Sequence, residues 1–157
     1  MPEYNGQQPR LNFRFSYPPG WELSEEVESD YAEVVLDGPE EADPDFGLTL
    51  SIAVFDAAPG ETNLRVLAGQ YAEERRQQAT LQITSQRAVQ VAGRPAEELE
   101  LRFRIEIADE TVTVRQRVYL LLEYGRLYEI NYSASQAAFD RHAAALDGLL
   151  ESFTFHD

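Results

Sequence analysis

The sequence predicts an α+β fold, with an antiparallel sheet of six or seven strands flanked by two main helices. Three observations predict it. Apolar residues recur at alternate positions in several runs, which is the period of a half-buried strand. Turns of two or three residues separate consecutive runs, and only antiparallel strands can be joined so closely. Two longer segments carry apolar residues at helical spacing.

The chain is expected to consist of a flexible N-terminal arm, 1–10, and a single domain, 11–157. The arm is polar and rich in turn-forming residues. Leu11–Tyr17 alternates apolar with polar residues and predicts the first strand. Pro18-Pro19-Gly20 then forces a turn, because proline fixes φ and glycine permits left-handed geometry.

The next segment is strongly acidic. Eleven Asp and Glu residues and no basic residue lie between Glu22 and Asp45, with one predicted strand, Tyr31–Leu36, inside the segment. Calcium is one hypothesis for so many oxygens, but the acids lack the alternate spacing, the glycine and the distal glutamate of an EF-hand loop. A solvated acidic loop is the other interpretation. Whether 22–45 becomes ordered on binding stays open.

The rest of the chain predicts five more strands and both helices. The strands are expected at Leu48–Phe55, Gln82–Val91, Pro95–Ile107, Thr111–Tyr124 and Leu127–Ala134. The last four are joined by turns at Ala92-Gly93-Arg94, Ala108-Asp109 and Gly125-Arg126. The helices are expected from an N-cap at Thr62 to about Gln78, and over Gln136–Glu151 with Ser135 as its cap.

One predicted sheet face concentrates positive charge. A turn at Ala108-Asp109 places two sets of residues on the same face: Glu98, Glu100, Arg102, Arg104 and Glu106 with Thr111, Thr113, Arg115, Arg117 and Tyr119. One interpretation is a solvated face whose arginines pair with neighbouring glutamates. The other is a site for an acidic partner segment or a small anion. The candidate partner-binding residues are Arg102, Arg104, Arg115, Arg117 and Tyr119.

Composition argues against several functions. The chain has 13 basic residues, all arginine, against 28 acidic ones, so its net charge of -15 repels nucleic acid and anionic membranes. Cysteine is absent, which removes disulfides and thiolate chemistry. No apolar run reaches the length of a membrane span, and the N-terminus does not resemble a signal peptide. A cytoplasmic location is expected, or an envelope-associated one if a leader was removed.

No catalytic arrangement is predicted. His142 follows Asp140 by two positions, so on a helix the two side chains point to different faces. No G-x-S-x-G elbow, dinucleotide fingerprint or phosphate loop occurs. Two isolated histidines make a poor metal site. We expect no enzymatic activity, no cofactor and no metal.

Motifs along the chain resemble the Mog/PsbP-like superfamily. They are Phe13-x-Phe15-x-Tyr17-Pro18-x-Gly20-Trp21, Gly93-Arg94-Pro95-Ala96, Tyr128-x-Ile130-x-Tyr132-Ser133-Ala134, Phe139-Asp140 and Glu151-Ser152-Phe153. The superfamily includes photosystem-associated PsbP proteins, a Ran-binding import factor, LpqN-type lipoproteins and chaperones of type VI secretion effectors. The resemblance implies an antiparallel sandwich flanked by helices and a non-enzymatic, partner-binding role. The lipoprotein cysteine and the metal-binding histidines of the PsbP branch have no counterpart here.

The resulting hypothesis is a non-catalytic module of bacterial type, adaptor-like or chaperone-like, that binds a protein or peptide. Binding of nucleic acid and insertion into a membrane are not expected, and homodimerisation stays open. One alternative is an envelope lipoprotein domain without its leader. Another is a small-ligand carrier with a pocket lined by Trp21, Tyr128 and Tyr132.

Overall fold

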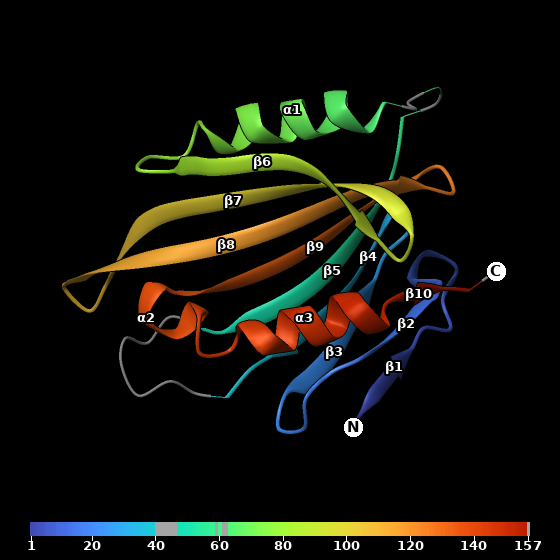
Figure 1. The fold of residues 1–157 in the computed structure, drawn as a ribbon, viewed down its shortest axis with the longest axis horizontal. Coiled ribbons are helices and arrows are strands. Elements are labelled where there is room, and N and C mark those ends of the chain that lie inside the picture. The colour runs from blue at the N-terminus through green and yellow to red at the C-terminus, as the bar shows by residue number, and fades with distance from the viewer. Residues whose placement is uncertain (40–46, 59, 61–62, 157) are drawn as a thin grey trace.

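The computed structural model describes residues 1–39, 47–58, 60 and 63–156. It is an α+β structure with two antiparallel sheets, as Figure 1 shows. The larger sheet has seven strands in the order β3-β4-β5-β9-β8-β7-β6, and the smaller has the order β1-β2-β10. The seven-stranded antiparallel sheet confirms the predicted fold class. The expected N-cap Thr62 and the acidic residues at 40–46 lie outside the described residues.

The elements follow one another along the chain with these bounds. The strands are β1 (Glu3–Asn5), β2 (Phe13–Ser16), β3 (Glu22–Val27), β4 (Tyr31–Asp37), β5 (Thr49–Asp56), β6 (Gln82–Val91), β7 (Arg94–Ile107), β8 (Glu110–Glu123), β9 (Arg126–Ser135) and β10 (Thr154–Phe155). The helices are a short 3₁₀ turn (Pro9–Leu11), α1 (Leu64–Arg75), α2 (Gln136–Phe139) and α3 (Ala143–Ser152).

The seven-stranded sheet has a covered inner face and a partly covered outer face. On the inner face, buried residues of α3 and of the small sheet, among them Leu146 and Phe13, share one core with Ile52 and Ile130 of the large sheet. Figure 1 shows α3 and the small sheet together on this side. On the outer face α1 packs its small residues, Ala68 and Ala72, against β7 and β8 in a second core. The helix therefore lies over the middle of these strands.

Tight turns fix the register of strands β6 to β9. The two central residues of each turn have positive φ, as type I′ hairpins require, and this geometry suits the twist of the flanking strands. The turn pairs are Ala92-Gly93, Ala108-Asp109 and Tyr124-Gly125. The last one corrects the predicted Gly125-Arg126 turn, because Arg126 already pairs with Glu123 across the ladder.

The N-terminal segment differs from the sequence expectation. Within 1–10, expected to be a flexible arm, Glu3–Asn5 forms β1 and pairs with β2, and Tyr4 is buried. The predicted strand Leu11–Tyr17 is present as β2, but it belongs to the small sheet. The acidic segment also contains an unpredicted strand, β3, which pairs with β4 along its whole length. A polar sequence was thus compatible with strand pairing because these strands lie at sheet edges.

The predicted C-terminal helix is broken into α2 and α3. Ser135 caps α2 as expected, accepting a hydrogen bond from the Ala138 N–H at 3.3 Å. The Tyr132 hydroxyl donates to the Phe139 carbonyl at 2.7 Å. In a continuous helix that carbonyl would accept from the N–H of residue 143. The tyrosine therefore binds the carbonyl of the residue at which α2 ends, and α3 begins at Ala143.

A close backbone contact at Gly6 gives a stability test. A Cβ atom at Gly6 would lie 1.7 Å from the Leu11 carbonyl oxygen, whereas a Cβ at Gly69 in α1 meets nothing within 4 Å. We expect Gly6→Ala to lower the free energy of unfolding by about 1 to 3 kcal/mol through overpacking. Gly69→Ala, the matched control, should raise it by about 0.5 to 1 kcal/mol because alanine favours helix. Chemical denaturation measures both, and a neutral Gly6→Ala would contradict the contact.

Candidate functional site

The structure brings the predicted arginines together on the inner face of the seven-stranded sheet. The register of β7 and β8 places Arg102 opposite Arg115, Glu100 opposite Arg117 and Glu98 opposite Tyr119. Arg117 in turn lies opposite Tyr132 of β9, whose side chain belongs to the main core. The predicted grouping on one face is therefore confirmed. It lies where the inner face passes from the covered core to the exposed strands β6 to β8.

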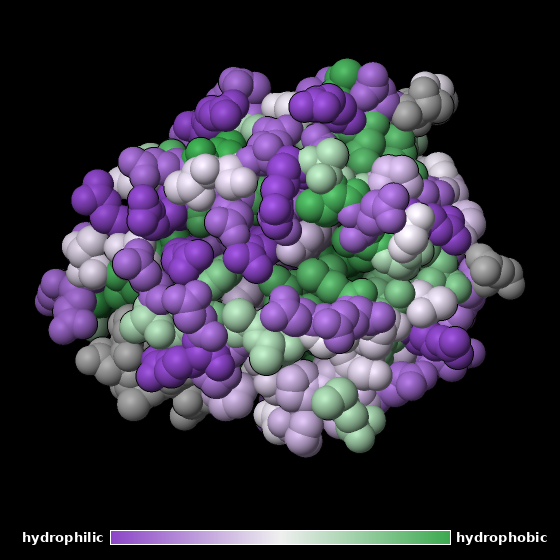
Figure 2. Space-filling model, viewed as in Figure 1, coloured by the Kyte–Doolittle hydropathy of each residue, from purple (hydrophilic) through white to green (hydrophobic). Residues whose placement is uncertain are grey.

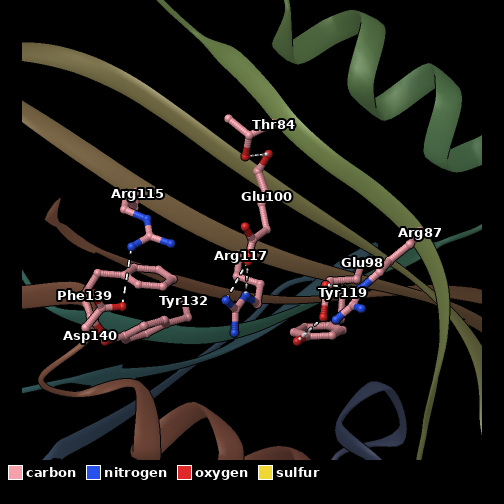
Figure 3. A network of polar contacts seen from close by, with 10 residues as sticks. All are labelled: Thr84, Arg87, Glu98, Glu100, Arg115, Arg117, Tyr119, Tyr132, Phe139 and Asp140. Carbon is pink, nitrogen blue, oxygen red and sulfur yellow. Dashed lines mark hydrogen bonds and ion pairs between the residues drawn. The ribbon is translucent and has the colours of Figure 1, made fainter.

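Helix α2 anchors one side of this cluster. The guanidinium carbon of Arg115 lies 4.1 Å from the centre of the Phe139 ring, and that of Arg117 lies 5.5 Å from it. A cation over an aromatic face is attracted by the ring quadrupole, by about 0.5 to 1 kcal/mol at exposed sites. Figure 3 shows both arginines beside Phe139. Phe139 thus orients the two side chains of β8.

The inner end of the cluster is internally neutralised. Arg117 donates to Glu100 Oε1 from Nε at 2.8 Å and from a terminal nitrogen at 2.6 Å. Next to it, Glu98 accepts from the Tyr119 hydroxyl at 2.6 Å and from Arg87 Nε at 2.8 Å, although Glu98 is only 5 % exposed. Figure 3 shows these contacts side by side across β6, β7 and β8. Arg117 and Tyr119 are therefore engaged within the fold.

These contacts set the ionisation of the buried pair. Burial alone would raise the pKa of Glu98, but the hydrogen bonds from Arg87 and Tyr119 outweigh it and hold the pKa below its ordinary value. Burial, and then the hydrogen bond to Glu98, raise the pKa of Tyr119. The glutamate is therefore charged and the tyrosine neutral at physiological pH.

The outer end of the cluster keeps unused donors. Arg102 and Arg104 are exposed, and among the described residues a terminal nitrogen of Arg102 reaches only Gln82 Oε1, at 3.5 Å. Within the described residues the Arg104 guanidinium makes no ion pair or side-chain hydrogen bond. Arg115 meets Asp140 at 3.5 Å, a long contact to a carboxylate that is 85 % exposed. These three guanidinium groups can still bind an anion.

Two neighbouring hollows lie over this outer end. One, of about 310 Å³, is lined by Arg102, Arg115 and Gln136 and also by Glu100, the partner of Arg117. The other, of about 320 Å³, is lined by Arg102, Arg104 and Gln136. Gln82 also lines the second. We call this surface the arginine groove, formed by Gln82, Arg102, Arg104, Arg115 and Gln136. Hydrophilic residues dominate the left half of Figure 2, where α2 and the ends of β7 and β8 lie in Figure 1.

Two groove residues were not predicted. Gln136 comes from α2, whose position over β8 depends on tertiary packing. Gln82 comes from β6, where a bulge between Ile83 and Ser85 shifts the register and places Gln82 opposite Arg102. Counting back from the Ala92-Gly93 turn without the bulge would put Gln82 opposite Phe103, whose side chain points to the other face. No local sequence signal marked that bulge.

The other sequence candidates have structural roles. Tyr128 and Tyr132 are fully buried, and Trp21 is nearly so, in the main core. The Tyr128 hydroxyl donates to Asn12 Oδ1 at 2.6 Å, and its ring packs edge-on against Phe155. The small-ligand pocket proposed at these residues is thus filled by side chains. Within the described residues, no three His, Cys, Asp or Glu side chains gather as metal ligands, and no helix is long and apolar enough to span a membrane.

The fold of the chain resembles that of solved structures. No protein-family model and no curated protein sequence matches the chain. Among solved structures, cyanobacterial PsbP (CyanoP) from Synechocystis sp. PCC 6803 superposes with a TM-score of 0.65 at 17 % identity, covering 98 % of this chain and 91 % of that one. The chain has the PsbP-like fold. This confirms the fold that the motif resemblance implied.

Two further solved structures resemble the chain in fold. LpqN of Mycobacterium tuberculosis, described as involved in cell envelope biogenesis, gives a TM-score of 0.62 at 18 % identity, covering 90 % of this chain and 82 % of that one. PA94 of Pseudomonas aeruginosa, a protein of unknown function, gives 0.55 at 14 % identity and covers 85 % of each chain. At such identities the likeness concerns the fold, and the site must be argued from this chain's own residues.

The Glu98 pair predicts how the stability of this PsbP-like fold depends on pH. Because the folded-state pKa of Glu98 is lowered, its contribution is present above the ordinary carboxyl pKa and is lost as pH falls through the folded value. Glu98→Gln should lower the free energy of unfolding at neutral pH by about 1 to 3 kcal/mol. The difference from the unsubstituted protein should shrink as the pH falls.

Denaturation at several pH values measures this effect. Glu74→Gln, an exposed change on α1, is the matched control and should leave stability within about 0.5 kcal/mol at every pH. A Glu98→Gln penalty that is equal at acidic and neutral pH would contradict the role of the charge.

Proposed function

We propose that this PsbP-like domain is a non-catalytic binding module that recognises an acidic segment of a protein or peptide through the arginine groove. The observation that carries the proposal is the exposure of Arg102 and Arg104, with no carboxylate partner in the described chain, in a protein with 28 acidic residues. Neighbouring arginines and glutamates are paired, so the outer end of the groove is the part with capacity for a partner.

The register of the strands supports this proposal. Arg102 and Arg115 are opposite each other in adjacent antiparallel strands, where like charges repel and destabilise the pair. A carboxylate bound between them would remove that repulsion and accept charge-assisted hydrogen bonds from both. The glutamine side chains of Gln82 and Gln136 bring further donors to the same place. The groove is therefore suited to an anionic group and unsuited to a basic one.

The test uses a defined probe, a fluorescein-labelled peptide with a run of glutamates at one end and alternating threonine and valine residues after it. We expect the double variant Arg102→Glu with Arg104→Glu to lose about tenfold or more in affinity, since each substitution removes charge-assisted hydrogen bonds. Fluorescence anisotropy measures the affinity. The same peptide with glutamine in place of glutamate should bind weakly to the unsubstituted protein.

Matched controls separate the groove from net charge. Arg14→Glu with Arg65→Glu makes the same change in net charge at exposed positions on β2 and α1, outside the groove. Equal losses in the two double variants would show that only the overall charge matters and would refute the groove as the site. Competition by citrate or phosphate without any peptide affinity would indicate a small-anion carrier instead.

A further inference from the structure

Strand β6 is an exposed edge of the seven-stranded sheet. It runs for ten residues, and within the described residues it pairs with β7 alone. Helix α1 packs on the outer face against β7 and β8, and in the described part of the chain no backbone hydrogen bond from a segment other than β7 reaches β6. One row of its backbone N–H and C=O groups is therefore available for an additional strand.

The two edges of this sheet differ in how they are protected. At the opposite edge, β3 carries three glutamates, Glu22, Glu25 and Glu26, and charged side chains on an edge discourage pairing with another chain. β6 contains no acidic residue, no proline and no lysine, and its one charge is Arg87. After the bulge, Ser85–Val91 pairs with β7 in unbroken register. In a chain of net charge -15, β6 is the longer of the two edge strands described in this sheet and the one without carboxylates.

The β6 edge and the arginine groove are continuous. Arg102 extends from β7 across to Gln82, the first residue of β6. Arg104 lies two residues further along β7, beside Thr80, which precedes β6. Its backbone N–H donates to the Thr80 hydroxyl at 3.0 Å, and its carbonyl accepts from the same hydroxyl at 3.2 Å. An extended segment lying beside β6 would therefore reach the two exposed guanidinium groups with side chains at one of its ends.

We propose that the partner segment binds as an added strand on β6, with its acidic residues at the end that lies against Gln82, Arg102 and Arg104. This rests on the proposed function and specifies its binding mode. Backbone hydrogen bonds along Ser85–Val91 supply affinity that does not depend on sequence, and the groove selects segments with acids at one end. The partner is thus an extended, β-forming segment with a terminal acidic cluster.

Charge distinguishes this occupant from a second copy of the chain. If two β6 strands paired with each other, each would offer the other only uncharged side chains and Arg87. Arg102 and Arg104 would gain no carboxylate from the facing β6. The two protein molecules, each with a net charge of -15, would also repel each other. A peptide with acids at one end satisfies both the edge and the groove, which a second copy's β6 does not.

Amide hydrogen exchange tests the added strand directly. The glutamate-tailed peptide is used in two forms, with the glutamates at its N-terminal or its C-terminal end, so that either strand direction is sampled. We expect backbone amides within Ser85–Val91 to exchange about tenfold or more slowly when one form is bound. Amides of β3 should be unchanged. The same peptide N-methylated at alternate residues keeps its charges and should lose the protection and most of the affinity.

The outcomes separate this inference from the proposed function. Binding that depends on Arg102 and Arg104 without new protection in β6 would overturn strand addition and leave the groove proposal standing. No binding of either peptide form at low salt would refute both. Protection of β6 that rises with protein concentration in the absence of peptide would identify a second copy as the occupant and overturn the inference.

Discussion

The hydrogen bond from the Tyr132 hydroxyl to the Phe139 carbonyl is the contact on which the site depends. The bond is made to the last residue of α2, which contacts β8 and β9, while α3 covers β2. The Phe139 ring packs on Tyr132 and lies beside Arg115. This buried tyrosine thereby helps to position Phe139, the aromatic support of the cluster, where α2 contacts β8 and β9.

The charges on the inner face of the seven-stranded sheet are arranged in order of burial. Where the face meets the core, Glu98 and Glu100 are paired with Arg87 and Arg117, since a buried carboxylate without a partner would be costly. Further out, solvent removes that requirement, and Arg102 and Arg104 remain exposed. The same row of residues thus stabilises the fold at one end and provides donors at the other. A substitution at Glu98 and one at Arg102 should accordingly affect different properties, stability in the first case and binding in the second.

Local patterns in the sequence predicted most of the fold, and tertiary contacts account for what it missed. The alternation in β4 to β9 and the Ala92-Gly93 and Ala108-Asp109 turns gave the strands and the β7–β8 register, because side-chain period and turn geometry are local properties. β3 was missed because an exposed edge strand has no apolar alternation. The break after Phe139 was missed because the contact made there, from the Tyr132 hydroxyl, comes from a strand seven residues earlier in the chain. For the site, the grouping of Arg102, Arg104 and Arg115 followed from the register. The position of Gln82 depends on a bulge in β6 that no sequence pattern predicted.

The contrast between the whole surface and the groove constrains what can bind. At physiological ionic strength charges more than about 8 Å apart are largely screened, so the net charge of -15 acts on large polyanions more than on a short segment in contact. A nucleic acid would bring many phosphates against acidic surface for each one that met Arg102 or Arg104. In the proposed binding mode, a segment with a few acids at one end would bring its charge only to the groove and lay an uncharged backbone along β6. Repulsion of polyanions is therefore compatible with the proposed binding of an acidic peptide, provided that the acids are local and the rest of the segment is extended.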